Sequence, residues 1–364
     1  MTARAWLLLA SLLYIGSSAF AYPRPPSGAE NIPALMAEST LVCKGEVVEA
    51  PTPTFVRSSA ALARMTATAE VHPDRCFKGT PPGSTIPVLF DRFLPAAGGP
   101  AFVLRKGDYR VFFLKPQNKQ YAIVNEWFGA LPASRELGPV PESADSMLLL
   151  ELDLKAGLRD SDSERVLDSI RMLGNMKKLN STAELRKLLD SPDLLVKTYV
   201  WQALLRLKDY SVLPAVADFF NSQPEPPHEL FLPRDRLFQM YYELEREIEG
   251  IRDPSTLPYL ERFAVSHVDY RLRDSALQAL RAIGSAHSAA TFLKELDDPN
   301  PDNAFAAMHG LLRLAGGGPI DWVPTWKQFD ETPQFYAGKC REWWNADGKQ
   351  KAAARAGDAM KCQF

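Results

Sequence analysis

The stretch SALQALRAIGS, residues 275–285, decides the fold of the second half of the chain. Its apolar residues recur every three or four positions, as they do on an amphipathic helix, and a glycine stands where such a helix usually ends. Segments of the same design occur before and after it. They align with it on Ser169, Ala203, Tyr241, Ala279 and Gly310: RVLDSIRMLGNMK (165–177), YVWQALLRLKD (199–209), FQMYYELEREIEG (238–250) and FAAMHGLLRLAGG (305–317).

A second helical segment follows each of the first four. One helix pair cannot bury its apolar face alone, so the next pair has to pack beside it. The sequence therefore predicts an α-solenoid over residues 161–330, and a C-terminal cap and tail over residues 331–364 in which Trp343 and Trp344 cover the last pair. The second segments are STAELRKLLDS (181–191), SVLPAVADFF (211–220), STLPYLERFAV (255–265) and AATFLKELDD (289–298).

Two of these regions, SPDLLVKTYVWQALLRL (191–207) and HVDYRLRDSALQALRAIG (267–284), resemble HEAT repeats of the short bacterial kind. Each has an aspartate near the start of its first helix, Asp193 and Asp269 respectively. The resemblance covers residues 160–318 and implies a HEAT-like α-solenoid.

The second helices of such an array form its concave wall, which is a binding surface in repeat proteins. By helical phase we expect Lys187, Tyr259 and Arg262 to face this wall as protein-binding residues. The alternative is that they are ordinary surface residues, because a single exposed side chain carries little information.

The first half of the chain shows the period-two alternation of β-strands. Turn-forming segments such as GTPPG, RKGD and KPQNKQ separate the strands. About five strands in this length predict a small antiparallel β-barrel over residues 22–137, followed by a linker and capping helix over residues 138–160. The strand candidates are TLVCKGEVVEA (40–50), RMTATAEVHPDRCFKG (64–79), STIPVLF (84–90), DYRVFFL (108–114) and QYAIVNEWF (120–128).

The succession LVCKGEVVEA (41–50), ATAEVHPDRCFKGTPPG (67–83) and LRKGDYRVFFLKPQNKQYAIV (104–124) resembles a netrin-like or tissue-inhibitor-of-metalloproteinase-like OB barrel, in the divergent form of exported bacterial proteins. The resemblance implies an OB-like fold for this half. In the animal inhibitors a cysteine at the mature N-terminus chelates the metal of a protease, whereas here the expected first mature residue is Tyr22. The resemblance therefore does not extend to that mechanism.

The N-terminus has the three parts of a secretory signal peptide over residues 1–21. Arg4 supplies a positive charge, AWLLLASLLYIG (5–16) a short apolar run, and Ala19-Phe20-Ala21 a cleavage site. A membrane anchor is the alternative, but the run is shorter than the roughly 20 residues that span a bilayer. We therefore expect a secreted or periplasmic protein without a membrane span.

Four cysteines in an exported chain favour two disulfides. The simplest of the three connectivities pairs neighbours, Cys43 with Cys76 and Cys340 with Cys362. A zinc site is the competing hypothesis, but the sequence has no C-x-x-C motif. An antiparallel hairpin of the first two strands would place Cys43 and Cys76 opposite each other.

Charge and motifs argue against several function classes. A formal net charge of −2 over 364 residues gives no basic field for nucleic acid. The sequence lacks H-E-x-x-H, G-x-S-x-G, P-loop and Rossmann motifs, so we expect no enzyme activity, no metal and no cofactor.

The carboxylate groups Asp297-Asp298 and Glu245-Glu247-Glu249 are interpreted as solvated helix ends and faces. In PNPDN (299–303) we expect Asp302 to cap the following helix. None of these groups is assigned a catalytic role.

A chain of two binding-type folds without enzyme motifs points to a non-catalytic protein-binding adaptor or scaffold. Its partner is another protein, bound by the concave face of the helical repeats and by the barrel. The alternative is an inhibitor or sensor of an extracellular hydrolase, which would insert a barrel loop such as FLPAAGGPAF (93–102) into a cleft.

If the signal peptide is removed, the exported protein should begin at Tyr22. Intact-mass measurement of the exported chain tests this expectation. Retention of residues 1–21 would contradict both the cleavage site and the inference of an exported protein.

Overall fold

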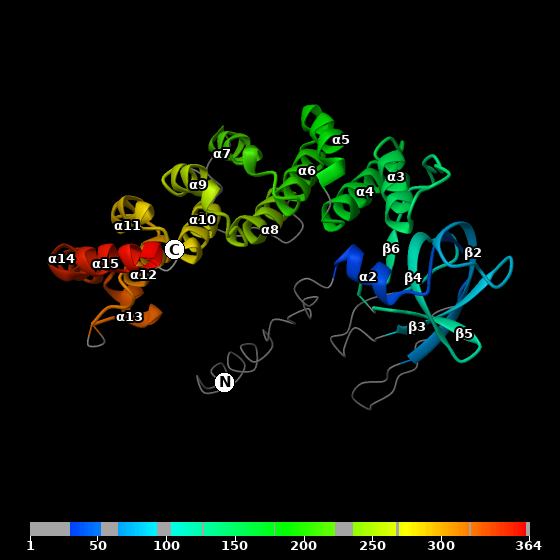
Figure 1. Ribbon diagram of the computed structural model, residues 1–364, viewed down its shortest axis with the longest axis horizontal. Helices are drawn as coiled ribbons and strands as arrows, with labels where there is room; N and C mark the ends of the chain where they lie inside the picture. Colours follow the sequence, from blue (N-terminus) through cyan, green and yellow to red (C-terminus); the bar gives the residue numbers. More distant parts are fainter. Residues whose placement is uncertain are drawn as a thin grey trace, which may run out of the picture. The chain divides into compact units, whose positions relative to one another are not determined.

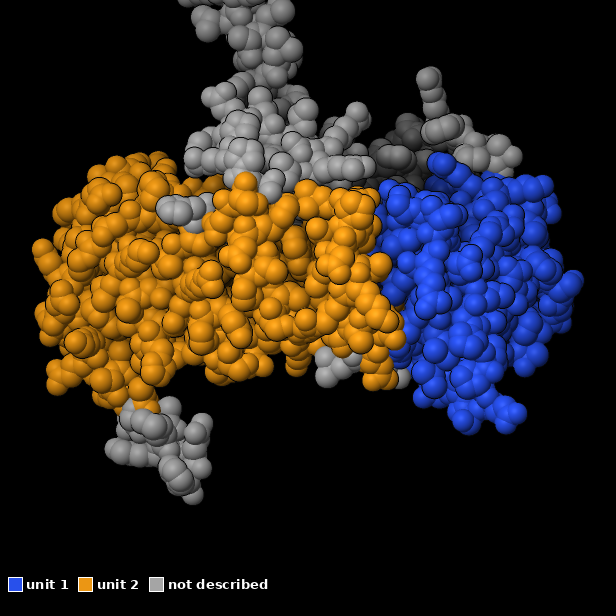
Figure 2. All heavy atoms as spheres, turned by 90° about the horizontal axis from the view of Figure 1, so that it is seen from above, with its two compact units in different colours: residues 1–172 blue, residues 173–364 orange. Residues whose placement is uncertain are grey.

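The computed structural model describes residues 30–51, 65–92, 103–125, 127–177, 179–222, 236–266, 269–319 and 322–361. The expected signal peptide, the loop 93–102 and Cys362 lie outside these residues. The chain divides into two compact units, residues 1–172 and 173–364 (Figure 2). A small β-barrel in the first unit is followed by a helical region, which confirms the predicted fold class.

Within the described residues, five strands close into a barrel in the order β1-β2-β3-β5-β4, with β4 returning to β1. A further short strand, β6 (Ala130–Pro132), adds to β4 outside this ring. The five strands are β1 (Leu41–Glu49), β2 (Met65–Lys78), β3 (Ile86–Arg92), β4 (Tyr109–Gln117) and β5 (Gln120–Ile123).

The barrel differs from the predicted antiparallel one in a single pairing, since β3 and β5 run parallel. The reason is topological. Strand direction cannot alternate all the way around a closed ring with an odd number of strands, so one neighbouring pair must be parallel. The remaining pairs of the ring are antiparallel.

The predicted disulfide between Cys43 and Cys76 is present. The two cysteines lie directly opposite each other in the β1–β2 register. Cys43 is fully buried in the barrel core beside residues such as Phe112 and Leu114. Cys340 is a buried thiol, and its pairing with Cys362 stays a prediction because Cys362 is not among the described residues.

Strand β1 is buried on both faces, which alternation alone did not predict. Its outward-facing Val42 and Lys44 are 0% and 2% exposed. Helix α3 (Ser146–Gly157) packs against the barrel through β2, and the Lys44 ammonium lies 3.0 Å from the Asp153 carboxylate of this helix. The segment 138–160 is therefore an integral part of the barrel unit.

Asp153 holds this junction together. Its side chain is 1% exposed and pairs with both Lys44 and Arg75. The backbone N–H of Gly138 donates a 2.7 Å hydrogen bond to the same carboxylate. Burial lowers the pKa of Lys44, and the charge of Asp153 opposes that shift. The helix is thus fastened to the barrel by a buried, fully engaged carboxylate.

A short helix that the sequence pattern did not predict, α2 (Ile32–Glu38), precedes the barrel. Asn31 caps it by accepting a 3.4 Å hydrogen bond from the N–H of Ala34. Its residues Ile32, Leu35 and Met36 are buried, and the helix contacts β4. The proline-rich segment that precedes this helix is not typical of helical sequence, so the pattern did not predict α2.

The helical region contains the predicted pairs. In Figure 1, helices α6, α8, α10 and α12 follow one another in one row, and α7, α9 and α11 in another. The first helices of the pairs are α4 (Ser163–Asn175), α6 (Leu194–Arg206), α8 (Arg236–Glu249), α10 (Tyr270–Ile283) and α12 (Pro301–Leu314). The second helices are α5 (Thr182–Lys187), α7 (Leu213–Ser222), α9 (Leu257–Ala264) and α11 (Ala289–Glu295).

Small residues stand where these helices approach closely. A Cβ atom on Gly310 would lie 2.5 Å from the Phe292 ring of α11, and one on Gly174 would lie 2.8 Å from the Cα of Ala203. Ala279 is fully buried in α10. The alignment positions Ala203, Ala279 and Gly310 are therefore packing positions.

The helix caps agree with the sequence in two cases and differ in one. Asp193 and Asp269 each accept a hydrogen bond from a backbone N–H two residues later. The cap of α12 is Asn300 and not Asp302, because the Asn300 side chain accepts from the N–H of Asp302 at 2.9 Å. Asp302 lies in the first turn instead.

Three helices and a π-helical turn close the array: α13 (Trp326–Glu331), α14 (Pro333–Trp343), η7 (Trp344–Gly348) and α15 (Lys349–Lys361). We call this segment the cap. All of its elements contact α12. Trp343 and Trp344 are 8% and 3% exposed, as expected for residues that cover the last pair. Among the described helices, none combines the length and the apolar character needed to cross a membrane.

We expect the substitution Asp153→Asn to lower the free energy of unfolding of the barrel unit by about 3–5 kcal/mol, because it leaves two cations without their buried counter-ion. Glu46→Gln is the matched control, since it breaks an exposed pair with Arg135 that is worth under about 1 kcal/mol. Urea denaturation of both variants measures the difference. Equal losses would contradict the role given to Asp153.

Candidate functional site

The three binding residues predicted from the sequence all lie on second helices and are exposed. Lys187 ends α5, and Tyr259 and Arg262 lie on α9, where Tyr259 is 41% exposed. The Arg262 guanidinium lies 3.5 Å from the carboxylate of Asp218 on α7. Their role in binding stays a prediction, and so does that of the loop 93–102, which lies outside the described residues.

A cluster of rings at the end of the array is more distinctive. Phe305 of α12 lies 5.3 Å from both Trp326 and Phe329 of α13, measured between ring centroids. Tyr336 of α14 contacts Phe329 at 6.3 Å and Phe335 at 5.1 Å. We call these five residues the aromatic surface. Because two helices of the cap and one of the array contribute rings, only the folded chain assembles it.

One ring of the aromatic surface is buried and two are accessible, with the Lys339 ammonium 4.7 Å from the centroid of the Phe335 ring. Phe329 is fully buried, whereas Trp326 and Phe335 are 39% and 54% exposed. Large aromatic side chains left this accessible are characteristic of binding surfaces. The ring-to-ring contacts hold them in place before any partner arrives.

The local sequence explains how α13 presents Trp326. Thr325 and Gln328 form a capping box, in which the Thr325 hydroxyl accepts from the N–H of Gln328 and the Gln328 side chain accepts from the N–H of Thr325. This capping box starts helix α13 at Trp326. Phe329 follows three residues later on the same face of the helix, so both rings pack against Phe305, but only Trp326, in the first turn, stays accessible.

A row of carboxylates belongs to the same end of the array. The charges of Asp302 and Glu249 act on Asp274, and the charge of Asp330 acts on Asp302, so these groups lie within electrostatic reach of one another. They come from α8, α10, α12 and α13. We call these four residues, with Glu245 of α8, the acidic row.

The acidic row is short of positive charge. Burial raises the pKa of Asp274 to about 6, and the charges of Asp302 and Glu249 act in the same direction. Burial also raises the pKa of Asp302, with a contribution from Asp330. Arg271 and Arg281 offset part of the charge: Arg271 pairs with Asp269 and lies 3.7 Å from Glu245, and the charge of Arg281 lowers the pKa of Asp274. Among the described residues, the five carboxylates therefore outnumber these two cations.

The sequence-based interpretation of the carboxylates needs two corrections. Glu245 and Glu247 are half-buried and not solvated, and Glu247 pairs with Arg206 at 2.7 Å. Asp298 is 8% exposed and pairs with Arg273 at 2.6 Å, so it is a buried structural anion and not a solvated helix end. Asp297 is exposed, as expected, and pairs with Arg341. The difference arises because Arg273 reaches Asp298 from the neighbouring helix α10.

His309 lies at the inner side of the aromatic surface. Its ring centroid is 4.4 Å from that of Phe305. Burial lowers the pKa of His309, with a further contribution from Arg281, so the ring is neutral at pH 7. Within the described part of the chain, no group of three or more histidine, cysteine, aspartate or glutamate side chains is arranged to hold a metal ion.

Sequence reasoning did not identify the aromatic surface or the acidic row. A signal was present in WVPTWKQFDETPQFY (322–336), where aromatic residues are unusually dense. That segment falls in the cap, whose helices do not follow the repeat pattern. Neither a search of protein-family models nor a search of curated proteins finds a match to this chain.

Chemically, the site offers aromatic faces, apolar area and negative charge. Lysine and arginine side chains complement all three, because their cationic heads pair with carboxylates and stack on aromatic rings while their stems cover apolar surface. The arrangement can therefore accommodate a segment that carries basic and apolar side chains.

We expect Asp274→Asn to stabilise the helical unit by about 1–3 kcal/mol at pH 7.5, because it removes a charge that the fold disfavours. The folded-state pKa of about 6 lies above the ordinary 3.8, so this penalty is full above pH 6 and disappears as the pH falls to 3.8. Melting temperatures at pH 7.5 and pH 4 measure the gain. Glu342→Gln, at an exposed position on α14, is the control. A gain that is the same at both pH values would contradict this account.

Proposed function

We propose that this chain is an exported, non-catalytic adaptor that binds another protein through the aromatic surface and the acidic row of its helical array. The observation that carries the proposal is the pair of accessible aromatic residues, Trp326 and Phe335, held in a fixed ring cluster. Tryptophan and tyrosine dominate the hot spots of protein interfaces.

The charge pattern defines the partner. Carboxylates on four neighbouring helices favour a partner segment that carries lysine or arginine next to apolar residues. Charge complementarity of this kind accelerates association, and burial of the aromatic anchors slows dissociation. The partner surface we propose is therefore basic and apolar.

The proposed location is the periplasm or the extracellular space. Support comes from the N-terminal signal pattern and from the Cys43–Cys76 disulfide, since disulfides persist in oxidising compartments. We also propose that the barrel is netrin-like and the array HEAT-like. The closed five-strand ring with its disulfide supports the first assignment, and stacked pairs with aspartate caps support the second.

The test compares two exposed aromatic residues of similar accessibility, Trp326 on α13 and Tyr259 on α9. A photo-crosslinking amino acid is placed at each position of the full exported chain, and crosslinked proteins are identified by mass spectrometry. We expect a basic protein to be captured from position 326. With that protein purified, Trp326→Ala should weaken binding by about 30-fold or more, and Tyr259→Ala by less than about twofold.

Two outcomes would contradict the proposal. A larger loss from Tyr259→Ala would place the interface on the second helices instead. Absence of a specific crosslink at position 326, in a protein whose melting temperature is unchanged, would show that the aromatic surface is not an interface.

A further inference from the structure

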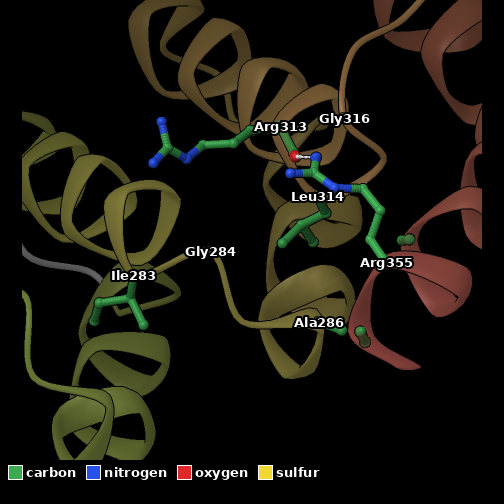
Figure 3. A pocket seen from close by; sticks show the side chains of 9 residues that line it. Ile283, Gly284, Ala286, Arg313, Leu314, Gly316 and Arg355 are labelled. Carbon is green, nitrogen blue, oxygen red and sulfur yellow. Dashed lines mark hydrogen bonds between the residues drawn. The ribbon is translucent and has the colours of Figure 1, made fainter. Parts of the chain in front are cut away.

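A cavity of about 600 Å³ lies where the C-terminal ends of α10 and α12 approach α15 (Figure 3). Its volume is typical of sites that bind small organic ligands. All of its lining residues belong to the helical unit. The cavity is separate from the aromatic surface, because its residues come from the opposite end of α12.

Two arginines supply the polar part of the lining. The Nη1 atom of Arg355 donates a 2.9 Å hydrogen bond to the carbonyl oxygen of Arg313. The Nη2 atom of Arg313 donates a 3.5 Å hydrogen bond to the carbonyl oxygen of Ala282. Figure 3 shows the Arg355 guanidinium directed at α12, while the Arg313 side chain extends away from it. Each guanidinium has five N–H donors, so each keeps donors beyond the one that the helix end uses.

The charge balance at the cavity is positive. Two guanidinium groups contribute two positive charges, and the C-termini of α10 and α12 contribute roughly −0.5 each. The net charge is therefore about +1. Among the described lining residues none is acidic. A single negative charge on the ligand matches this net charge.

A glycine lies beside each arginine. Gly316 has a φ of 83°, and a Cβ atom there would lie 2.7 Å from Nη1 of Arg355, so the observed position of this guanidinium depends on the missing side chain. Gly284 has a φ of 71° and ends α10, and a Cβ atom there would lie 4.0 Å from Nε of Arg313, which is an ordinary contact.

The remaining lining is apolar. Ile283 and Leu314 come from the ends of the two helices, and Ala286 and Ala352 from the facing elements. Small side chains on the α15 side leave room for a ligand body. The cavity is half open, and its lining exposes more polar than apolar surface, with the apolar part supplied by these side chains.

We propose that this cavity binds an organic monocarboxylate with a short apolar body. The carboxylate pairs with the free donors of Arg355, the charge of Arg313 adds to the attraction, and the body lies against Ile283 and Leu314. Arginine suits this role because its planar guanidinium matches the geometry of a carboxylate. Such a group is carried both by a free small acid and by the C-terminus of a peptide.

The test measures binding to the full mature chain by isothermal titration calorimetry. The probes are 4-phenylbutyrate and the acetylated peptide Ala-Ala-Phe with a free C-terminal acid. Their neutral counterparts are 4-phenylbutan-1-ol and the same peptide as its amide. We expect saturable 1:1 binding of at least one acid, and about tenfold weaker binding of its neutral counterpart. Which acid binds more tightly distinguishes a small-molecule site from a peptide-terminus site.

Variants distinguish the loss of ligand binding from the loss of a hydrogen bond to a helix-end carbonyl. Arg313→Gln and Arg355→Gln should each weaken binding about tenfold or more. Arg252→Gln is the matched control, because Arg252 also donates to helix-end carbonyls, those of Glu249 and Ile251, but lies outside the cavity. Ala286→Trp should block binding by filling the cavity without removing a charge.

Circular dichroism melting curves verify that each variant is folded. The proposal is overturned if neither acid binds saturably to the wild-type chain, or if acids and neutral counterparts bind equally. It is also overturned if Arg252→Gln reduces the affinity as much as Arg355→Gln does.

Discussion

The last helix of the array has an apolar face that must be covered, and both candidate binding sites depend on the segment that covers it. Each pair in the array buries its apolar face against the next, but α12 has no following repeat. The cap covers it instead, with Phe329, Ala337 and Cys340 at 0–1% exposure. Both candidate binding sites arise where this irregular segment meets the last regular helix.

The two sites lie at opposite ends of helix α12, and their charges have opposite signs. Asp302 stands in its first turn and Arg313 in its last, and each charge is favourable at that end of the helix dipole. Asp302 of the acidic row and Phe305 occupy the N-terminal half, whereas the cavity with its two arginines lies at the C-terminal end. One helix thereby contributes to an anionic, aromatic surface and, at its other end, to a cationic cavity.

In the barrel unit, the constraint is the packing of helix α3 on the outer face of the barrel. Its outer face beside β1 is covered by α3, and the contact is centred on a buried carboxylate between two cations. Such a pair adds little net stability compared with an apolar contact, yet losing one partner is costly. The arrangement therefore specifies where α3 docks. The disulfide acts in the same unit by joining the neighbouring strands β1 and β2 at directly paired positions.

The sequence by itself determined the elements and several of their local features. Alternation predicted the five barrel strands, the 3.6-residue period predicted the helix pairs, and strand register predicted the Cys43–Cys76 bond. Asp193 and Asp269 were recognisable as caps because a cap is made within a few residues. These features depend on residues that are close together in the sequence, so a sequence pattern can predict them.

Only the tertiary structure decided which distant residues meet. Lys44 lies in an alternating strand, yet it is buried because Asp153, 109 residues away, neutralises it. Trp326, Asp274 and Arg355 gained their surroundings in the same way, from helices that are separate in sequence. The parallel β3–β5 pair likewise follows from closing the ring. A sequence pattern states which face of an element is apolar, but the partner of that face is chosen by packing the whole chain.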